Sequence, residues 1–133
     1  MSSPDEQQIR TLIHQWAEAV HTGDLDRVLA DHADDILMFD VPPPYNGVRG
    51  IHAYAETWPP FFEWQAAGAS FELDWLDVTA GSDTAYACAL LRCGTAQELL
   101  DKPDSRLRLT LGLRKEQGSW IVCHEHHSFA DDR

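Results

Sequence analysis

Residues 106–128 read RLRLTLGLRKEQGSWIVCHEHHS and contain the clearest secondary-structure pattern of the chain. Polar side chains alternate with leucines from Arg106 to Leu111, which is typical of a strand with one solvated and one buried face. Glu116-Gln117-Gly118-Ser119 is typical of a turn, and residues 120–128 follow it as a second strand. We therefore predict an antiparallel hairpin in which residue 115 pairs with residue 120.

The segments upstream of the hairpin predict helices first and most of the strands later. Ser3-Pro4 is typical of a helix start, the apolar residues after it have helical spacing, and Gly23 is typical of a helix end. Asp24 is expected to cap a short second helix. A third helix is expected from Ile51 to Trp58, with Pro59-Pro60 kinking or breaking it. Further predictions are a buried strand from Ile36 to Val41, a strand from Ser70 onward, a strand from Thr84 to Cys93, and a polar connection from Thr95 to Asp104.

Length and composition predict one α+β domain over residues 1–133. A chain of 133 residues, of which 44% are hydrophobic, can bury a core of its own. No repeat or linker divides it. Helices that precede a run of antiparallel strands are expected to pack on one face of the sheet.

The net charge argues against two classes of partner, and the N-terminus and the cysteines give further expectations. The net charge of −12 repels phosphate backbones and anionic lipids, so neither nucleic acid nor a membrane is an expected partner. The N-terminus lacks the basic and apolar regions of a signal peptide, so a cytoplasmic location is expected. The 3 cysteines lack CxxC spacing and are expected to be packing residues. Nothing in the sequence indicates a cofactor.

Two segments carry a likeness to a known family. The first begins His21-Thr22-Gly23-Asp24-Leu25-Asp26, continues through Ala33-Asp34-Asp35 and ends at Phe39-Asp40, and the second covers residues 118–128. Together they resemble the nuclear-transport-factor-2-like superfamily, in particular its ketosteroid-isomerase and SnoaL-like branches. The resemblance implies a cone-shaped, cystatin-like fold with three N-terminal helices on a strongly curved, mainly antiparallel sheet. It also implies a small-molecule pocket between helices and sheet, and a homodimer.

The resemblance to the ketosteroid isomerases assigns residues to that pocket. Their general-base aspartate falls on Asp40, and their oxyanion-hole tyrosine falls on Trp16. A supporting tyrosine falls on Trp58, and the protonated aspartate falls at or near Thr110. Only one of these functional positions is retained, so steroid isomerisation itself is not expected. Trp16, Trp58 and Tyr54, which is expected on the same helix as Trp58, are predicted to bind a small, ring-containing ligand.

Asp40 is the first candidate for a reactive group. It shares a strand face with Ile36 and Met38, and a carboxylate in such apolar surroundings is a better proton acceptor near neutrality. The alternative is an aspartate at a strand end that hydrogen-bonds the proline-rich turn. The tryptophans likewise have an alternative as plain core residues.

The last strand holds the most unusual cluster of side chains. Strict alternation would place Trp120, Val122, His124 and His126 on one face, and Ile121, Cys123, Glu125 and His127 on the other. The resemblance directs the second set toward the pocket, where Glu125 and His127 are candidate acid and base groups. The expected register places Thr110 opposite Glu125 and Arg108 opposite His127. The alternative is a polar network that only stabilises the sheet.

The first set offers a metal-binding alternative. Two imidazoles in a His-x-His pattern, His124 and His126, lie side by side on one strand face, as in several zinc and iron sites. A third ligand is needed, and spacing indicates none among the other histidines, which include His32. A position of His124 and His126 in a subunit interface is the competing interpretation.

The two faces of the 106–113 strand suggest opposite roles. Arg108, with Arg106 and Arg114, lies opposite the leucine face, and its guanidinium suits the carboxylate of an anionic substrate. The competing interpretation is a set of ion pairs with neighbouring strands. The leucines need burial, and a homodimer formed through the sheet would provide it.

Three functions remain as hypotheses. The first is an isomerase- or lyase-type enzyme in which Asp40 removes a proton from a small apolar carbonyl compound, while Trp16, Thr110 or Arg108 stabilises the oxygen. The second is a non-catalytic ligand-binding or dimerisation domain. The third is a metal-dependent enzyme that uses His124 and His126.

Overall fold

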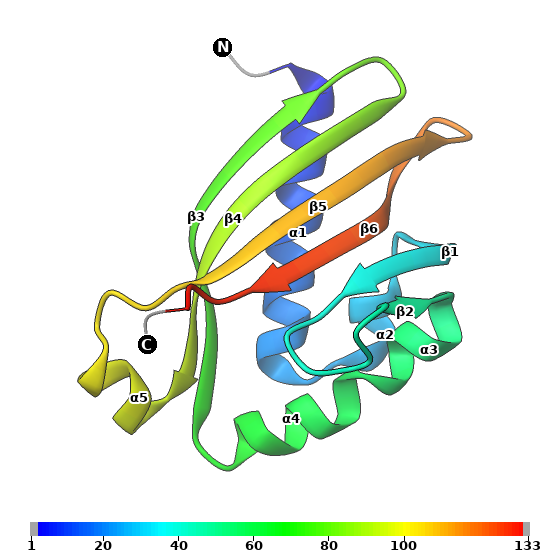
Figure 1. Cartoon of the computed structure of the whole chain (residues 1–133). Helices are drawn as coiled ribbons and strands as arrows, with labels where there is room; N and C mark the ends of the chain where they lie inside the picture. The colour runs from blue at the N-terminus through cyan, green and yellow to red at the C-terminus, as the bar shows by residue number, and fades with distance from the viewer. Residues whose placement is uncertain (1–2, 132–133) are drawn as a thin grey trace.

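Helices cover one side of a curved sheet in the computed structural model, which describes residues 3–131 (Figure 1). The helices are α1 (Pro4–Thr22), α2 (Leu25–Leu29), α3 (Ile51–Glu56), α4 (Trp58–Ala66) and α5 (Ala96–Asp101). The strands are β1 (His32–Phe39), β2 (Val48–Arg49), β3 (Ala69–Ala80), β4 (Thr84–Thr95), β5 (Leu107–Glu116) and β6 (Ser119–Ser128). The predicted α+β, cystatin-like class is confirmed.

The sheet has the order β2-β1-β6-β5-β4-β3. All neighbouring pairs are antiparallel except β1 and β6, which run parallel. This arrangement places the end of β1 beside the end of β6, with Met38 paired with Glu125. Two segments far apart in the sequence therefore meet at one place, just before Asp40.

The first helix forms as its sequence predicts. The Ser3 hydroxyl accepts a hydrogen bond from the Glu6 backbone N–H, and Gly23 ends the helix in the left-handed conformation with φ 75°. The helix buries Ile9, Ile13, Trp16 and Val20 against the sheet. Among the described residues no helix is long and apolar enough to cross a membrane.

The third helix is shorter than predicted, and a fourth follows it. The break comes at Thr57, because Pro59 lies in the first turn of α4 and fits a helix start there. Trp58 and the aromatic residues after it therefore belong to α4, which buries Trp58 in the core and packs Phe61 and Phe62 against it. The connection predicted from Thr95 to Asp104 also contains a helix, α5. Its start carries a capping box in which Thr95 and Glu98 exchange hydrogen bonds.

The leucine face of β5 is covered within the chain. Leu107, Leu109, Leu111 and Leu113 are each at most 4% exposed and belong to the hydrophobic core under the helices. The argument that these leucines need a dimer for burial was therefore wrong, since the helices already cover them. The opposite, outer face carries the exposed side chains of β5.

Candidate functional site

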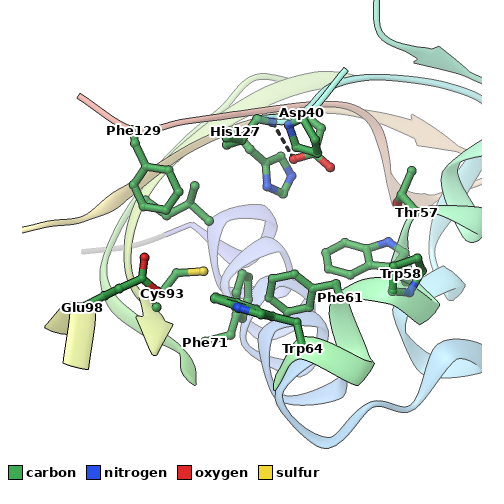
Figure 2. Close-up of a pocket in the computed structure, with 15 residues that line it drawn as sticks. Asp40, Thr57, Trp58, Phe61, Trp64, Phe71, Cys93, Glu98, His127 and Phe129 are labelled. Atoms are coloured by element: carbon green, nitrogen blue, oxygen red, sulfur yellow. Dashed lines mark hydrogen bonds between the residues drawn. The ribbon is translucent and has the colours of Figure 1, made fainter. Parts of the chain in front are cut away.

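A cavity of about 360 Å³ opens between α4, the ends of β1 and β6, and the start of β5 (Figure 2). Most of its wall is apolar, with several aromatic rings, and its polar groups are few. The aromatic lining residues are Trp58, Phe61, Trp64, Phe71 and Phe129. The side chains that can ionise in the same lining are Asp40, Cys93, Glu98 and His127. A volume of this size lies at the lower end of the range for small-molecule sites.

Asp40 lies at the wall of this cavity, one residue after β1 ends. Its side chain is half-buried, and Oδ1 accepts a hydrogen bond of 2.7 Å from the Val41 backbone N–H. Asp40 thus binds the chain at the start of the proline-rich turn, as one interpretation predicts, and it also lines the cavity. Its role as a proton acceptor stays a prediction. Oδ2 is not used by the bond to Val41.

His127 faces the same cavity from β6 and is held from behind by Glu125. The ring is 6% exposed, and its Nε2–H donates to Glu125 Oε1 at 2.9 Å. Nδ1 has no hydrogen-bond partner among the described residues. Figure 2 shows the ring between Asp40 and the aromatic wall. His127 is therefore the one imidazole that the structure offers to a ligand in this cavity.

Glu125 is fully buried and does not line the cavity. Its Oε2 accepts hydrogen bonds from the Tyr54 hydroxyl at 2.6 Å and from His32 Nε2 at 3.0 Å. The Tyr54 hydroxyl in turn accepts from Trp16 Nε1 at 3.2 Å. A buried carboxylate with this many donors is well satisfied. We call these five residues, His32, Tyr54, Trp16, Glu125 and His127, the buried network.

The electrostatics of the network favour an ion pair. Burial would raise the pKa of Glu125, but hydrogen bonds from His127 and His32 and the charges of both rings lower it to about 2. Burial would lower the pKa of His127, but the hydrogen bond and charge of Glu125 and the charge of Asp40 raise it overall. Burial, helped by the charge of Glu125, raises the pKa of Tyr54 well above its usual value. The structure therefore favours a carboxylate on Glu125 and a protonated His127.

A β-bulge puts Glu125 and His127 on the cavity side. The predicted pairing of residue 115 with residue 120 is confirmed, but the register shifts between Gly112 and Leu113. Glu125 is consequently opposite Leu111, and His127 is opposite Leu109. The predicted pairings Thr110–Glu125 and Arg108–His127 were wrong for this reason. Strict alternation along β6 was also wrong, because Trp120 and Val122 are buried on the same side as Glu125 and His127.

The bulge leaves two predicted ligand-binding residues on the outer face. Thr110 is exposed and pairs with His126. Arg108 is also exposed and donates to the Ser128 hydroxyl and the Phe129 carbonyl. Neither lines the cavity. The outer arginines follow the interpretation as partners of neighbouring strands, as in Arg106–Asp74.

The predicted aromatic ligand-binding residues divide between cavity and core. Trp58 lines the cavity and is 4% exposed. Trp16 and Tyr54 are buried behind it and act within the network. The buried Trp58 indole N–H makes no hydrogen bond with any of the described residues.

The His-x-His pattern gains no third ligand from the fold. His124 Nδ1 lies 2.8 Å from the Leu37 carbonyl, His126 is exposed, and both rings contact Phe39. Within residues 3–131, no group of three or more His, Cys, Asp or Glu side chains is placed to hold a metal ion. His32 joins Glu125 instead, on the other side of the sheet.

Sequence reasoning missed several residues of the site. His32 was one of several histidines without an indicated role, because its partner Glu125 is 93 positions away. Cys93 and Glu98 enter the lining from β4 and α5, and burial raises the pKa of the Cys93 thiol to about 12. That thiol is neutral at physiological pH and acts as part of the wall. Pro42 and Glu98 place the proline-rich turn and the predicted polar connection at the cavity wall.

Comparison with known proteins identifies the family. Residues 9–132 match the model of the SnoaL-like domain. An NTF2-like protein of unknown function from Pseudomonas putida KT2440 is 36% identical, with a TM-score of 0.85 over 99% of this chain and 91% of that chain. Among curated proteins, no match was found.

More distant structures share the fold. A candidate ketosteroid isomerase from Shewanella frigidimarina is 20% identical, with a TM-score of 0.68 over 89% of this chain and 92% of its own. A candidate aromatic ring hydroxylase from Novosphingobium aromaticivorans is 19% identical, with a TM-score of 0.71 over 98% of this chain and 93% of its own. At this level of identity the likeness establishes a common architecture and no common chemistry.

Proposed function

This chain belongs to the SnoaL-like domain family, and on that premise we propose that it is an enzyme of the isomerase or lyase type acting on a small, ring-containing carbonyl compound. The observation that carries the proposal is a pair of side chains. Asp40 and His127 face one largely apolar cavity, and the charge of Asp40 helps to raise the pKa of His127. A proton acceptor and a proton donor are thereby offered to the same ligand.

The roles follow from the charges. Asp40 accepts the proton from the carbon next to the carbonyl group, and the electrons of that C–H bond form the C=C bond of an enolate. His127 donates a hydrogen bond to the oxygen, which gains the negative charge. When the proton on Asp40 returns to a different carbon, the reaction is an isomerisation. When a hydroxyl group on the next carbon leaves with that proton as water, the reaction is a dehydration.

Glu125 and the residues behind it support His127 without touching a ligand. The hydrogen bond from Nε2–H to Glu125 fixes the ring orientation and directs Nδ1 away from the carboxylate. His127 thus replaces Trp16, Thr110 and Arg108 as the group that stabilises the oxygen, because none of those three lines the cavity.

The lining indicates a flat, uncharged ligand. Aromatic walls favour ring stacking, while Asp40 and Glu98 repel an anionic ligand. Trp64 and Phe129, which both line the cavity, are 37% and 39% exposed. A bound ring would cover part of both.

Hydrogen–deuterium exchange tests the proposed chemistry without the natural substrate. We expect the protein to catalyse exchange of the C–H protons next to the carbonyl of 2-tetralone in D2O, followed by proton NMR. Asp40→Asn should lower the exchange rate by about 100-fold or more, because the amide cannot accept the proton. Asp34→Asn, an exposed position on the same strand, is the matched control and should retain the rate.

Two outcomes would redirect the proposal. An unchanged rate in Asp40→Asn would remove Asp40 from the chemistry. Saturable binding of 2-tetralone with no exchange above the solution rate would instead favour the non-catalytic ligand-binding domain.

The exposed face of the sheet supports a further, separate proposal of a homodimer. Trp75 and Tyr86 are 50% and 53% exposed on the β3–β4 hairpin. Large aromatic side chains of this kind are enriched in subunit interfaces. Sedimentation equilibrium on the protein and on Trp75→Ser tests whether this face joins two copies.

A further inference from the structure

His32 is a member of the buried network that does not line the cavity. It begins β1, its side chain has no exposed surface, and its ring stacks on Tyr54 with centroids 5.2 Å apart. Nδ1 lies 2.8 Å from the Ala30 carbonyl, and Nε2 lies 3.0 Å from Glu125 Oε2. Every polar atom of this ring therefore has a partner inside the protein.

Both ring nitrogens of His32 face oxygen atoms that can only accept. A carbonyl oxygen has no proton to give, and the hydrogen bonds around Glu125 keep it a carboxylate. The Tyr54 proton also points at Glu125, because the Tyr54 oxygen accepts from Trp16. A hydrogen bond at each nitrogen of His32 requires a proton on each, which makes the ring a cation beside the buried carboxylate.

The two oxygens of Glu125 are thus shared between two histidines. Oε1 holds His127 at 2.9 Å, and Oε2 holds His32 at 3.0 Å. We infer that His32 is a positioning residue. It partly neutralises the charge of Glu125 from the side away from His127, and so limits how strongly Glu125 stabilises the protonated form of the His127 ring. One consequence for catalysis is that His127 loses its Nδ1 proton closer to neutral pH, and this consequence rests on the proposed function. The effect of His32 on the protonation of His127 does not rest on it.

The sign of the effect follows from the groups around His127. From other elements, the groups that face the same cavity or network are His32, Asp40, Tyr54, Cys93 and Glu98. His32 is the only one of these that is cationic in this arrangement. Removing it takes away a repelling charge and leaves His127 and the Tyr54 hydroxyl as the donors to Glu125. Both changes favour the protonated form of His127.

Titration of the His127 ring by NMR tests the inference without any substrate. In His32→Phe the ring still stacks on Tyr54, but the charge and both N–H groups are lost. The midpoint of the His127 titration should rise by about one pH unit. In His32→Gln an amide N–H still reaches toward Glu125, so the midpoint should rise by less. An unchanged or lower midpoint in the folded variants would overturn the inference.

The matched controls separate this inference from the proposed chemistry. His14→Gln, an exposed position on α1, should leave the His127 midpoint unchanged. If the deuterium exchange described above is catalysed, the alkaline limb of its pH profile should move upward in His32→Gln together with the midpoint. A midpoint that moves while the limb stays would uphold the role of His32 and remove His127 from the chemistry.

Discussion

β5 and β6 are neighbouring strands, yet only one of them follows the simple rule of alternation. Along β5, every leucine faces the core, and Arg108 and Thr110 face outward. Along β6 the same rule fails after Val122, because the bulge inserts an extra residue. The difference shows how polar residues reach the inner face of the sheet. The regular strand contributes only leucines to the core, whereas the bulge in β6 directs the side chains of Glu125 and His127 to the same face.

The largest effect should come from removing the carboxylate that the bulge buries. Glu125→Leu leaves His32, His127 and the Tyr54 hydroxyl without their acceptor, so the free energy of unfolding should fall by about 3–5 kcal/mol. Urea denaturation measures the change. The matched control is Leu111→Met, directly opposite on β5, where a volume-conserving change should cost less than about 1.5 kcal/mol. If both variants lowered the free energy of unfolding equally, the buried carboxylate of β6 would matter no more than a core leucine of β5, and the contrast between the strands would be wrong.

A smaller effect should appear in the pH dependence of stability. The pKa of Glu125 is lowered from 4.5, so its contribution is present above pH 4.5 and is lost as pH falls toward about 2. The pKa of His127 is raised above 6.5, so its contribution is present below pH 6.5 and is lost as pH rises through the folded value. The stabilisation from the pair should therefore be greatest between pH 4.5 and 6.5.

Urea midpoints from pH 3 to pH 9 in the natural protein and in Glu125→Leu provide the measurement. Other carboxylates with lowered pKa values, such as Asp5 and Asp35, titrate in both proteins, so the difference between the two curves isolates the network. A constant difference from pH 3 to pH 9 would contradict the assignment of the ion pair.

The fold was predictable from the sequence because its signals are local. The cap at Ser3, the left-handed Gly23 and the alternation of β5 each depend on residues close in the chain. The cone-shaped class and Asp40 at the cavity followed from the resemblance to the superfamily. The break at Thr57 and helix α5 were missed. Both helix starts, a proline in the first turn of α4 and a capping box at α5, lie in segments whose composition is typical of loops.

The site was less predictable because it depends on pairings across the sheet. The strand that holds His32 pairs in parallel with the strand that holds Glu125, and its register shifts between residues 32 and 37. No spacing rule brings these two residues together. The bulge in β6 changes the face of every residue after it, so a prediction from parity alone assigned Thr110 and Arg108 to the wrong partners.

The smallest effect should come from the residue that faces the bulge on the regular strand. A Cβ atom on Gly112 would lie 3.2 Å from the His124 Cβ, which is too close for an unstrained contact. Gly112→Val should therefore lower the free energy of unfolding by about 1–3 kcal/mol, as measured by urea denaturation. Thr110→Val, also on β5 and exposed, is the matched control and should change it by less than about 0.5 kcal/mol. Because valine otherwise favours strands, a neutral Gly112→Val would mean that the bulge can relax, and the orientation of Glu125 and His127 would then depend on the buried network rather than on the backbone of β6.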